Sequence, residues 1–332
     1  LIKKAESISF KNMFIVYRGL LKNFSFNFFT ITTAMQTSMF FAMNGFMPYE
    51  FERKGVSMSE FGIWFSFTSL GYIFGNIINS KLSPKVGLER MCLLGTVCSF
   101  CSVLIFFGNN NLFQNGPLVL SLICMLFGCS NGFAVANSMT GAINSSKLNK
   151  GAASGLMGAF QVGSGGMAGF LIIYFGGAQN FNICLYALFI MSGISIISSY
   201  LILQIKKMSI KKRFIEMIKN GYPEFDQEND SVEIDFEGGG DDFGSFGYVY
   251  IYPNREGDID LSESENRDLL LDIIDAGDVR YTWINNGTTG NIKYNEEGHQ
   301  ELAVYTLVSE EYYGYVEEAE EEVENTNEEV NG

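Results

Sequence analysis

Two polar side chains and one aromatic side chain recur at helical spacing in an apolar segment near the start of the chain. Gln36, Phe40 and Asn44 share one face of a helix, because residues four apart are neighbours there, and Met43 borders the same face. Methionine and aromatic side chains adapt to irregular apolar ligands. The face could therefore line a site for a bulky hydrophobic molecule. Ordinary packing against a neighbouring helix is the alternative use of the same side chains.

Small residues repeat at four-residue intervals in two other apolar segments. Gly71 and Gly75 form one pair, and Gly151, Gly155 and Gly163 belong to a longer series further along the chain. Such spacing lets helix backbones approach closely in lipid, which gives helices no hydrophobic reason to associate. We expect these five glycines to be helix-packing positions, and the spacing alone indicates packing rather than function.

Residue types that could perform catalysis or bind metal do not occur in suitable arrangements. His299 is the single histidine, and the six cysteines lie in or beside the apolar segments without metal-ligand spacing. Glu237, Asp241 and Asp242 lack the spacing of a calcium-binding loop. We therefore expect no enzyme activity and no catalytic residues, and also no metal and no cofactor.

Six long apolar segments would have to position these side chains. They cover residues 27–47, 61–79, 91–108, 117–140, 152–176 and 183–205. None contains Asp, Glu, Lys, Arg or His, and each is near the ~20 residues that a helix needs to cross the hydrocarbon core. A soluble core would need six successive helices without a polar face. The expected fold is a multi-pass α-helical membrane protein with six transmembrane helices.

Charge divides the chain at about residue 220. Residues 1–220 hold 18 Lys and Arg against 6 Asp and Glu, whereas residues 221–332 hold 4 against 31. In the first part, fifteen basic residues lie before the first span, in alternate loops and after the sixth span, and only Arg53 and Lys54 lie in the other loops. Lys and Arg are retained on the cytoplasmic side. We therefore expect both termini in the cytoplasm, with the spans in the inner membrane of a bacterium.

The acidic second part has the pattern of a small α+β soluble domain. Alternation over 232–236 and 246–252 predicts strands, 262–276 predicts a helix, 281–284 with 290–294 predicts a hairpin, and 302–308 predicts a last strand. The strong negative charge excludes nucleic acid and anionic lipid head groups as partners and leaves a basic protein open.

The expected organisation has five parts. They are a cytoplasmic lead (1–26), the six-helix membrane part (27–205), a basic linker with an amphipathic segment (206–224), the acidic α+β domain (225–316) and a disordered acidic tail (317–332).

Four segments in the membrane part resemble a known transporter family. They are Met-Pro-Tyr-Glu-Phe-Glu at 47–52, Gly-Val-Ser followed by Phe-Gly within 55–62, Phe-Gly followed by Phe-Ala-Val-Ala-Asn-Ser within 127–138, and Gly-Ala-Ala-Ser-Gly-Leu with a later Gln within 151–161. In this order and spacing, residues 20–205 look like the C-terminal six-helix half of a major facilitator superfamily transporter. The subtype they resemble is the bicyclomycin-resistance type of drug/proton antiporter.

The resemblance implies a site and a set of partners. The first and fourth spans would line the substrate cavity, which assigns substrate binding to Gln36, Phe40, Asn44, Asn131 and Asn137. In this superfamily two six-helix halves rock about a site near the bilayer midplane. The implied partners are a lipophilic small-molecule substrate, a coupling proton, membrane lipid and an N-terminal half missing from this chain.

Proton coupling needs a group that titrates within the pathway, and the six spans contain none. The coupling carboxylate is therefore expected in the missing half. Glu50 and Glu52, at the outer end of the first span, are the nearest candidates in this chain, but beside Arg53 and Lys54 they are expected to be solvated.

Three further features shape the functional hypotheses. The start at Leu1 suggests an N-terminally truncated fragment, and Met208 after the last span suggests a fusion of two genes. The acidic domain resembles a small bacterial and phage domain of uncharacterised role. The main hypothesis is the C-terminal half of a proton-coupled multidrug or small-solute efflux antiporter that is incomplete alone. The alternative is a membrane-anchored acidic interaction module with non-transporting spans.

Overall fold

A computed structural model describes most of the chain. The described residues are 10–113, 116–146, 149–239, 242–252, 255–256, 259, 261, 264–276 and 288–308. They divide into two compact units, Leu1–Lys206 and Lys207–Gly332. Asp241, the predicted strand at 281–284 and the predicted disordered tail at 317–332 lie outside the described residues.

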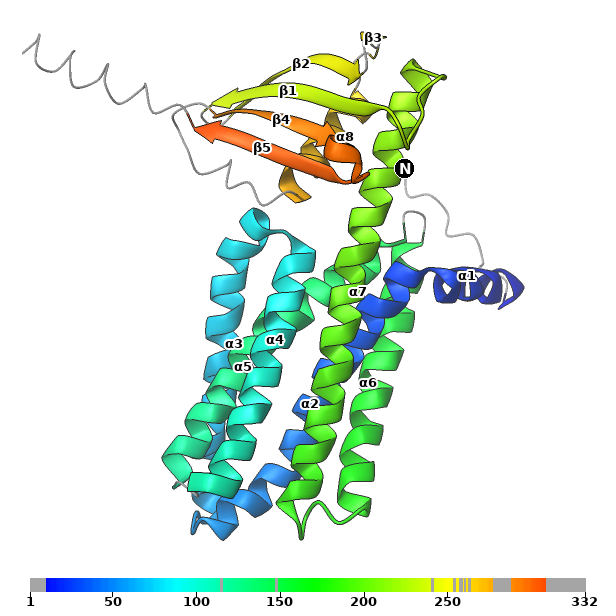
Figure 1. The fold of residues 1–332 in the computed structure, drawn as a ribbon. Coiled ribbons are helices and arrows are strands. Elements are labelled where there is room, and N and C mark those ends of the chain that lie inside the picture. The colour runs from blue at the N-terminus through cyan, green and yellow to red at the C-terminus, as the bar shows by residue number, and fades with distance from the viewer. Residues whose placement is uncertain are drawn as a thin grey trace, which may run out of the picture. The chain divides into compact units, whose positions relative to one another are not determined.

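The first unit is a bundle of long helices. Its elements are α1 (Phe10–Lys22), α2 (Phe24–Arg53), α3 (Met58–Val86), α4 (Leu88–Gly108), the π-helical η1 (Asn109–Phe113), α5 (Pro117–Asn144), α6 (Lys150–Tyr174) and the first part of α7 (Phe181–Gly221). Within this unit α2 to α7 run side by side, while α1 lies at a steep angle to them (Figure 1).

Five of the described helices are long and apolar enough to cross a membrane. They are α3, α4 with its π-helical end, α5, α6 and α7. The helix α2 is 30 residues long, but its polar residues, among them Thr32, Thr33 and Gln36, lower its hydropathy. These polar side chains are buried against neighbouring helices rather than exposed. Length and composition therefore identify five candidate spans, and the first expected span, 27–47, lies in α2, which is not among them.

The helix α5 lies at the centre of the bundle and contacts α2, α3, α4 and α6. Its contact with α3 brings the two backbones close together, because a Cβ atom at Gly71 would overlap the carbonyl of Met125 and one at Gly75 would overlap the carbonyl of Cys129. Short polar contacts add to the packing, and Thr33 on α2 donates a hydrogen bond to Ser138 on α5 at 2.8 Å.

Glu50 differs from the expectation of a solvated carboxylate. It is 5% exposed, and its Oε2 lies 2.7 Å from Nη1 of Arg53, while its Oε1 lies 3.8 Å from Nζ of Lys54. Nη2 of Arg53 also donates to the carbonyl of Ala178, between α6 and α7, at 2.6 Å. The expectation was wrong for Glu50 because α2 continues to Arg53 and keeps this carboxylate inside the helix end, whereas Glu52 is exposed.

The turn into α3 follows the chemistry of its residues. Gly55 has a φ of 82°, which a glycine adopts at no steric cost. Ser57 then caps α3, and its backbone N–H donates to the carboxylate of Glu60 at 3.1 Å, as in a capping box. This segment, 55–62, is one of the four that carry the family resemblance.

The second unit is built on an antiparallel sheet. Its strands are β1 (Ser231–Gly239), β2 (Asp242–Tyr252), β3 (Arg255–Glu256), β4 (Thr288–Tyr294) and β5 (Leu302–Val308), in the order β3-β2-β1-β4-β5. The helix α8 (Ser264–Ala276) and the 3₁₀ turn η3 (Glu296–Gly298) complete the described elements. Ile234 pairs with Val249 on one side and with Ile292 on the other, and these side chains share the apolar core with Leu270 of α8 and Phe214 of α7.

In the predicted hairpin, the strand at 281–284 lies outside the described residues, and residues 290–294 pair with other strands. Both edges of β4 are occupied, since it pairs with β1 along one side and with β5 along the other. The alternation of side-chain polarity over residues 290–294 correctly predicted a strand, which is β4. Its partner β1 lies far away in the sequence, where local turn signals cannot identify it, whereas its partner β5 follows after the short segment 295–301.

A small polar cluster lies on the sheet between β4 and β5. Nζ of Lys293 is 3.3 Å from Oε1 of Glu296 and 3.4 Å from Oε1 of Glu233, and the Tyr305 hydroxyl donates to Oε2 of Glu296 at 2.6 Å. The hydrogen bonds from Tyr305 and Lys293 hold the pKa of the Glu296 carboxyl below its ordinary value. In return, the hydrogen bond to Glu296 raises the pKa of Lys293, and the negative charge of Glu233 adds to this effect.

Candidate ligand-binding site

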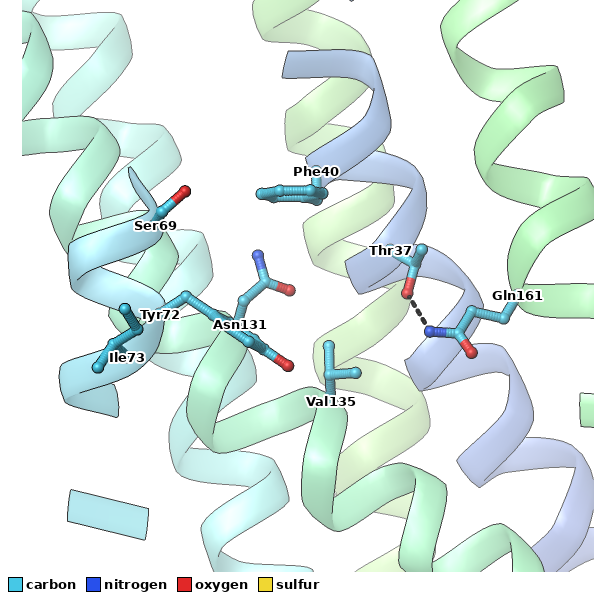
Figure 2. A pocket seen from close by; sticks show the side chains of 8 residues that line it. All are labelled: Thr37, Phe40, Ser69, Tyr72, Ile73, Asn131, Val135 and Gln161. Atoms are coloured by element: carbon cyan, nitrogen blue, oxygen red, sulfur yellow. Dashed lines mark hydrogen bonds between the residues drawn. The ribbon is translucent and has the colours of Figure 1, made fainter. Parts of the chain in front are cut away.

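A pocket of about 350 Å³ lies between four helices of the bundle. Its lining residues are Thr37 and Phe40 from α2, Ser69, Tyr72 and Ile73 from α3, Asn131 and Val135 from α5, and Gln161 from α6 (Figure 2). The volume falls at the lower end of the ~300–1,000 Å³ typical of small-molecule sites. The pocket is thus large enough for a small ligand or for part of a larger one.

The pocket lies at mid-length of all four helices. Thr37, Asn131 and Gln161 are each separated from both ends of their helices by more than ten residues, or roughly 16–24 Å at 1.5 Å per residue. If these helices cross a bilayer of ~30 Å hydrocarbon thickness, the pocket lies close to its midplane.

The lining combines apolar surface with uncharged polar groups. Phe40, Ile73 and Val135 supply apolar surface, and none of the eight lining residues is an acid, a base or a histidine. Tyr72 and Ile73 are 40% and 53% exposed, so the wall formed by α3 does not close the pocket.

Asn131 is the most unusual of these residues. It is 2% exposed, yet neither its Oδ1 nor its Nδ2 has a hydrogen-bond partner in the described part of the chain. Its amide group points into the pocket toward Phe40 (Figure 2). A buried amide without partners is costly, and in native proteins such a group calls for an explanation, for example a bound water or a ligand.

A second amide in the pocket is already engaged. Nε2 of Gln161 donates to Oγ1 of Thr37 at 3.0 Å (Figure 2). This bond joins α6 to α2 and fixes the orientation of the Gln161 side chain. The pocket therefore contains one polar contact that holds two helices together and one buried amide without a partner in the described residues.

The Major Facilitator Superfamily model matches residues 27–224, which is more than half of the chain and includes all eight residues that line the pocket. The chain belongs to the major facilitator superfamily. It is therefore a membrane protein with a general role in transport across membranes, and members of this superfamily are generally not enzymes. No curated protein and no solved structure shows a significant match to the chain.

In this superfamily member, two of the three residues proposed from α2 lie outside the pocket. Phe40 lines it, but Gln36 is fully buried and its Nε2 donates to Oγ of Ser195 on α7 at 2.9 Å. Asn44 is exposed, and its Nδ2 donates to the carbonyl of Phe40 in its own helix at 2.8 Å. Helical spacing correctly places the three residues on one helix but does not determine which neighbour each one meets.

The two asparagines proposed from α5 also have different surroundings. Asn131 lines the pocket, whereas Asn137 is tied into a contact between α5 and α3. Nδ2 of Asn137 donates to Oδ1 of Asn79 at 2.7 Å, and its Oδ1 accepts from the hydroxyl of Ser83 at 2.7 Å. This arrangement supports a packing role for Asn137, and substrate binding by it stays a prediction.

Several pocket residues were not among those proposed from the sequence. Ser69, Tyr72 and Ile73 lie at positions i, i+3 and i+4 of α3, a spacing that places them on one face. Gln161 is the only amide in α6 and lies within a segment that carries the family resemblance. A search for uncharged polar residues at mid-span would have found Gln161, Ser69 and Tyr72, but not the apolar Ile73.

The proposed packing glycines of α6 differ from those of α3. Around Gly151, Gly155 and Gly163, no atom of the described residues outside the adjacent backbone of α6 lies within 4 Å of the position that a Cβ would occupy. Gly71 and Gly75, in contrast, lie directly against α5. Close packing at the α6 glycines stays a prediction, and any tight partner would have to come from outside the described part of this chain.

Proposed function

We propose that the chain is one six-helix half of a transporter for lipophilic small molecules, with α2 as its sixth membrane-spanning helix. The observation that most directly supports the proposal is the mid-span pocket between α2, α3, α5 and α6, with an apolar lining and an unpaired buried amide. Superfamily transporters bind substrate near the bilayer midplane, between two halves that rock against each other. A half-site with one open wall fits that arrangement.

The finer assignment is the C-terminal half of a proton-coupled multidrug or small-solute efflux antiporter of the bicyclomycin-resistance type. It rests on the four resembling segments and on the apolar character of the pocket. The proposed location is the inner membrane of a bacterium, with both ends of the chain in the cytoplasm. The bundle would be surrounded by membrane lipid.

The coupling proton is assigned to the partner half. In α2 to α6 every acidic or basic residue lies within six residues of a helix end, so none of them reaches the pocket. The buried carboxylate of Glu50 is at the end of α2 and is neutralised by Arg53 and Lys54. A proton carrier within the pathway would therefore be a carboxylate of the first six-helix half.

Drug accumulation in cells tests this proposal. Cells that make residues 1–332 alone are expected to accumulate a lipophilic compound as fully as cells that lack the protein, because half of the pathway is missing. Cells that also make the first half of a related carrier, with its intramembrane carboxylate, are expected to accumulate less. Robust proton-driven efflux from cells that make residues 1–332 alone would contradict the proposal.

The alternative proposal, a membrane-anchored acidic interaction module, draws on the separate compact unit Lys207–Gly332. The same cells distinguish the two proposals when that unit is deleted. If the helix bundle carries out transport, efflux in the presence of the partner half should persist when the unit Lys207–Gly332 is deleted. An anchor, in contrast, would give no efflux with or without the unit.

A further inference from the structure

We infer that the pocket selects uncharged molecules that carry a hydrogen-bond donor and an acceptor side by side on an apolar body. Asn131 would recognise such a molecule by forming a hydrogen bond with each of the two groups. The inference rests on the proposed function, since it names the substrate class of the same site. For the half-site that this chain forms, it treats the ligand as a neutral polar molecule rather than a lipophilic cation or anion.

The exclusion of charged ligands follows from the distribution of charge. The lining contains no ionised group, and in α2 to α6 the charged side chains are confined to the helix ends, about two or more helical turns from the pocket. An ion at mid-span without a counter-charge is strongly disfavoured in an apolar medium. A neutral molecule enters at no such cost.

The need for a donor and an acceptor follows from Asn131. A carboxamide offers one acceptor oxygen and two donor hydrogens, and in Asn131 both ends lack a partner in the described part of the chain. A ligand with only an acceptor satisfies Nδ2 and leaves Oδ1 unpaired. Only a ligand that carries a hydrogen-bond donor next to an acceptor satisfies both ends of the amide group.

The remaining lining fits an apolar body. Phe40 offers an aromatic ring, and Ile73 and Val135 offer branched aliphatic surface on the other helices. The Gln161 amide differs from that of Asn131, because its Nε2 already donates to Oγ1 of Thr37. The volume of about 350 Å³ accommodates a ring system with one polar substituent.

Three matched probes test the inference on the full chain in lipid nanodiscs. 2-Naphthamide is neutral and carries an adjacent donor and acceptor, methyl 2-naphthoate is neutral with an acceptor only, and 2-naphthylmethylammonium is a cation. Binding is measured by equilibrium dialysis with empty nanodiscs subtracted. We expect the amide to bind at least about tenfold more tightly than either analogue, because each analogue leaves a buried polar group unpaired.

Variants of Asn131 then assign the preference to this residue. In Asn131→Leu, and in the smaller Asn131→Ala, the amide and the ester should bind alike. Asn131→Leu should not lower the melting temperature, because the amide that it removes has no partner in the described residues. Asn111→Leu is the matched control, since Asn111 is exposed and lies far from the pocket, where its side chain bonds the backbone of Phe107 and the side chain of Asn110. It should retain the preference of the wild type.

The inference is overturned if the wild type prefers the cation, if it binds none of the three probes, or if both Asn131 variants keep the amide preference. A clear loss of melting temperature in both Asn131 variants would also overturn it, because it would indicate a structural role. These results are independent of the transport assay. Efflux without a preference for neutral probes rejects the inference alone, whereas an Asn131-dependent preference without efflux rejects the proposed function alone.

Discussion

Gly71→Ala should lower the stability of the purified protein, whereas Gly155→Ala should raise it or leave it unchanged. Both glycines lie inside helices, where alanine is favoured by up to ~1 kcal/mol. At Gly71 the new Cβ would overlap the backbone carbonyl of Met125, and a backbone carbonyl cannot rotate away as a side chain can. Overpacking typically costs about 1–3 kcal/mol, and this contact should fall at the upper end of that range.

The opposite signs make this pair of variants a sharp test of the close contact between α3 and α5. Thermal unfolding of the chain in detergent gives the comparison, with Gly75→Ala as a second variant at the same helix contact. Because no atom of the described residues lies near the Cβ position of Gly155, its variant measures helix propensity alone. Equal shifts for Gly71→Ala and Gly155→Ala would contradict the arrangement of these helices.

Arg53→Leu is expected to destabilise the protein by about 2 kcal/mol. Removing one partner of a fully buried ion pair costs ~3–5 kcal/mol because the other charge is left uncompensated. The Arg53 side chain is 37% exposed, and Lys54 still lies 3.8 Å from Glu50, so the loss should be smaller. The variant also removes the hydrogen bond to the carbonyl of Ala178.

A double-mutant cycle separates the ion pair from the other contacts of Arg53. Glu50→Gln removes the buried charge, so adding Arg53→Leu to it should cost less than Arg53→Leu costs in the wild type. We expect a coupling of roughly 1 kcal/mol or more between the two positions, measured by unfolding in detergent. Strictly additive effects would show that Glu50 and Arg53 do not interact in the folded protein.

The six helices were predictable because the membrane imposes a strong and simple rule. A long segment without charge is stable as a helix in lipid, and all six predicted segments lie within α2 to α7, except the last two residues of 152–176. Their ends were less predictable, because charged residues can extend a helix beyond the hydrocarbon. The helix α2 continues through Glu50 to Arg53, and α7 continues past Lys206 to Gly221.

The site was only partly predictable because its formation depends on tertiary contacts. Helical spacing grouped Gln36, Phe40 and Asn44, but the bundle turns Gln36 toward Ser195 and leaves Asn44 at the surface. Asn131 came from the family resemblance rather than from its own surroundings. Tyr72 joins the pocket because Gly71 allows α3 to approach α5, a consequence that spacing alone does not reveal.

Local patterns were sufficient for most strands of the acidic unit and insufficient for their pairing. Alternation located residues 232–236, 246–252 and 302–308 within β1, β2 and β5. The two-residue strand β3 is too short to show a pattern. The order β3-β2-β1-β4-β5 places β4 beside β1, with paired residues 50 or more positions apart in sequence, and no short-range signal encodes that contact.

The membrane crossing of α2 is the central requirement, because α2 supplies Thr37 and Phe40 to the pocket yet is less apolar than the other five long helices. Reporter tags that act on only one face of the membrane measure it directly, when placed before α1, in the turn at Gly55 and after β5. We expect the first and last tags on the same face and the Gly55 tag on the opposite face. First and last tags on opposite faces would mean an odd number of crossings and would contradict the six-helix half.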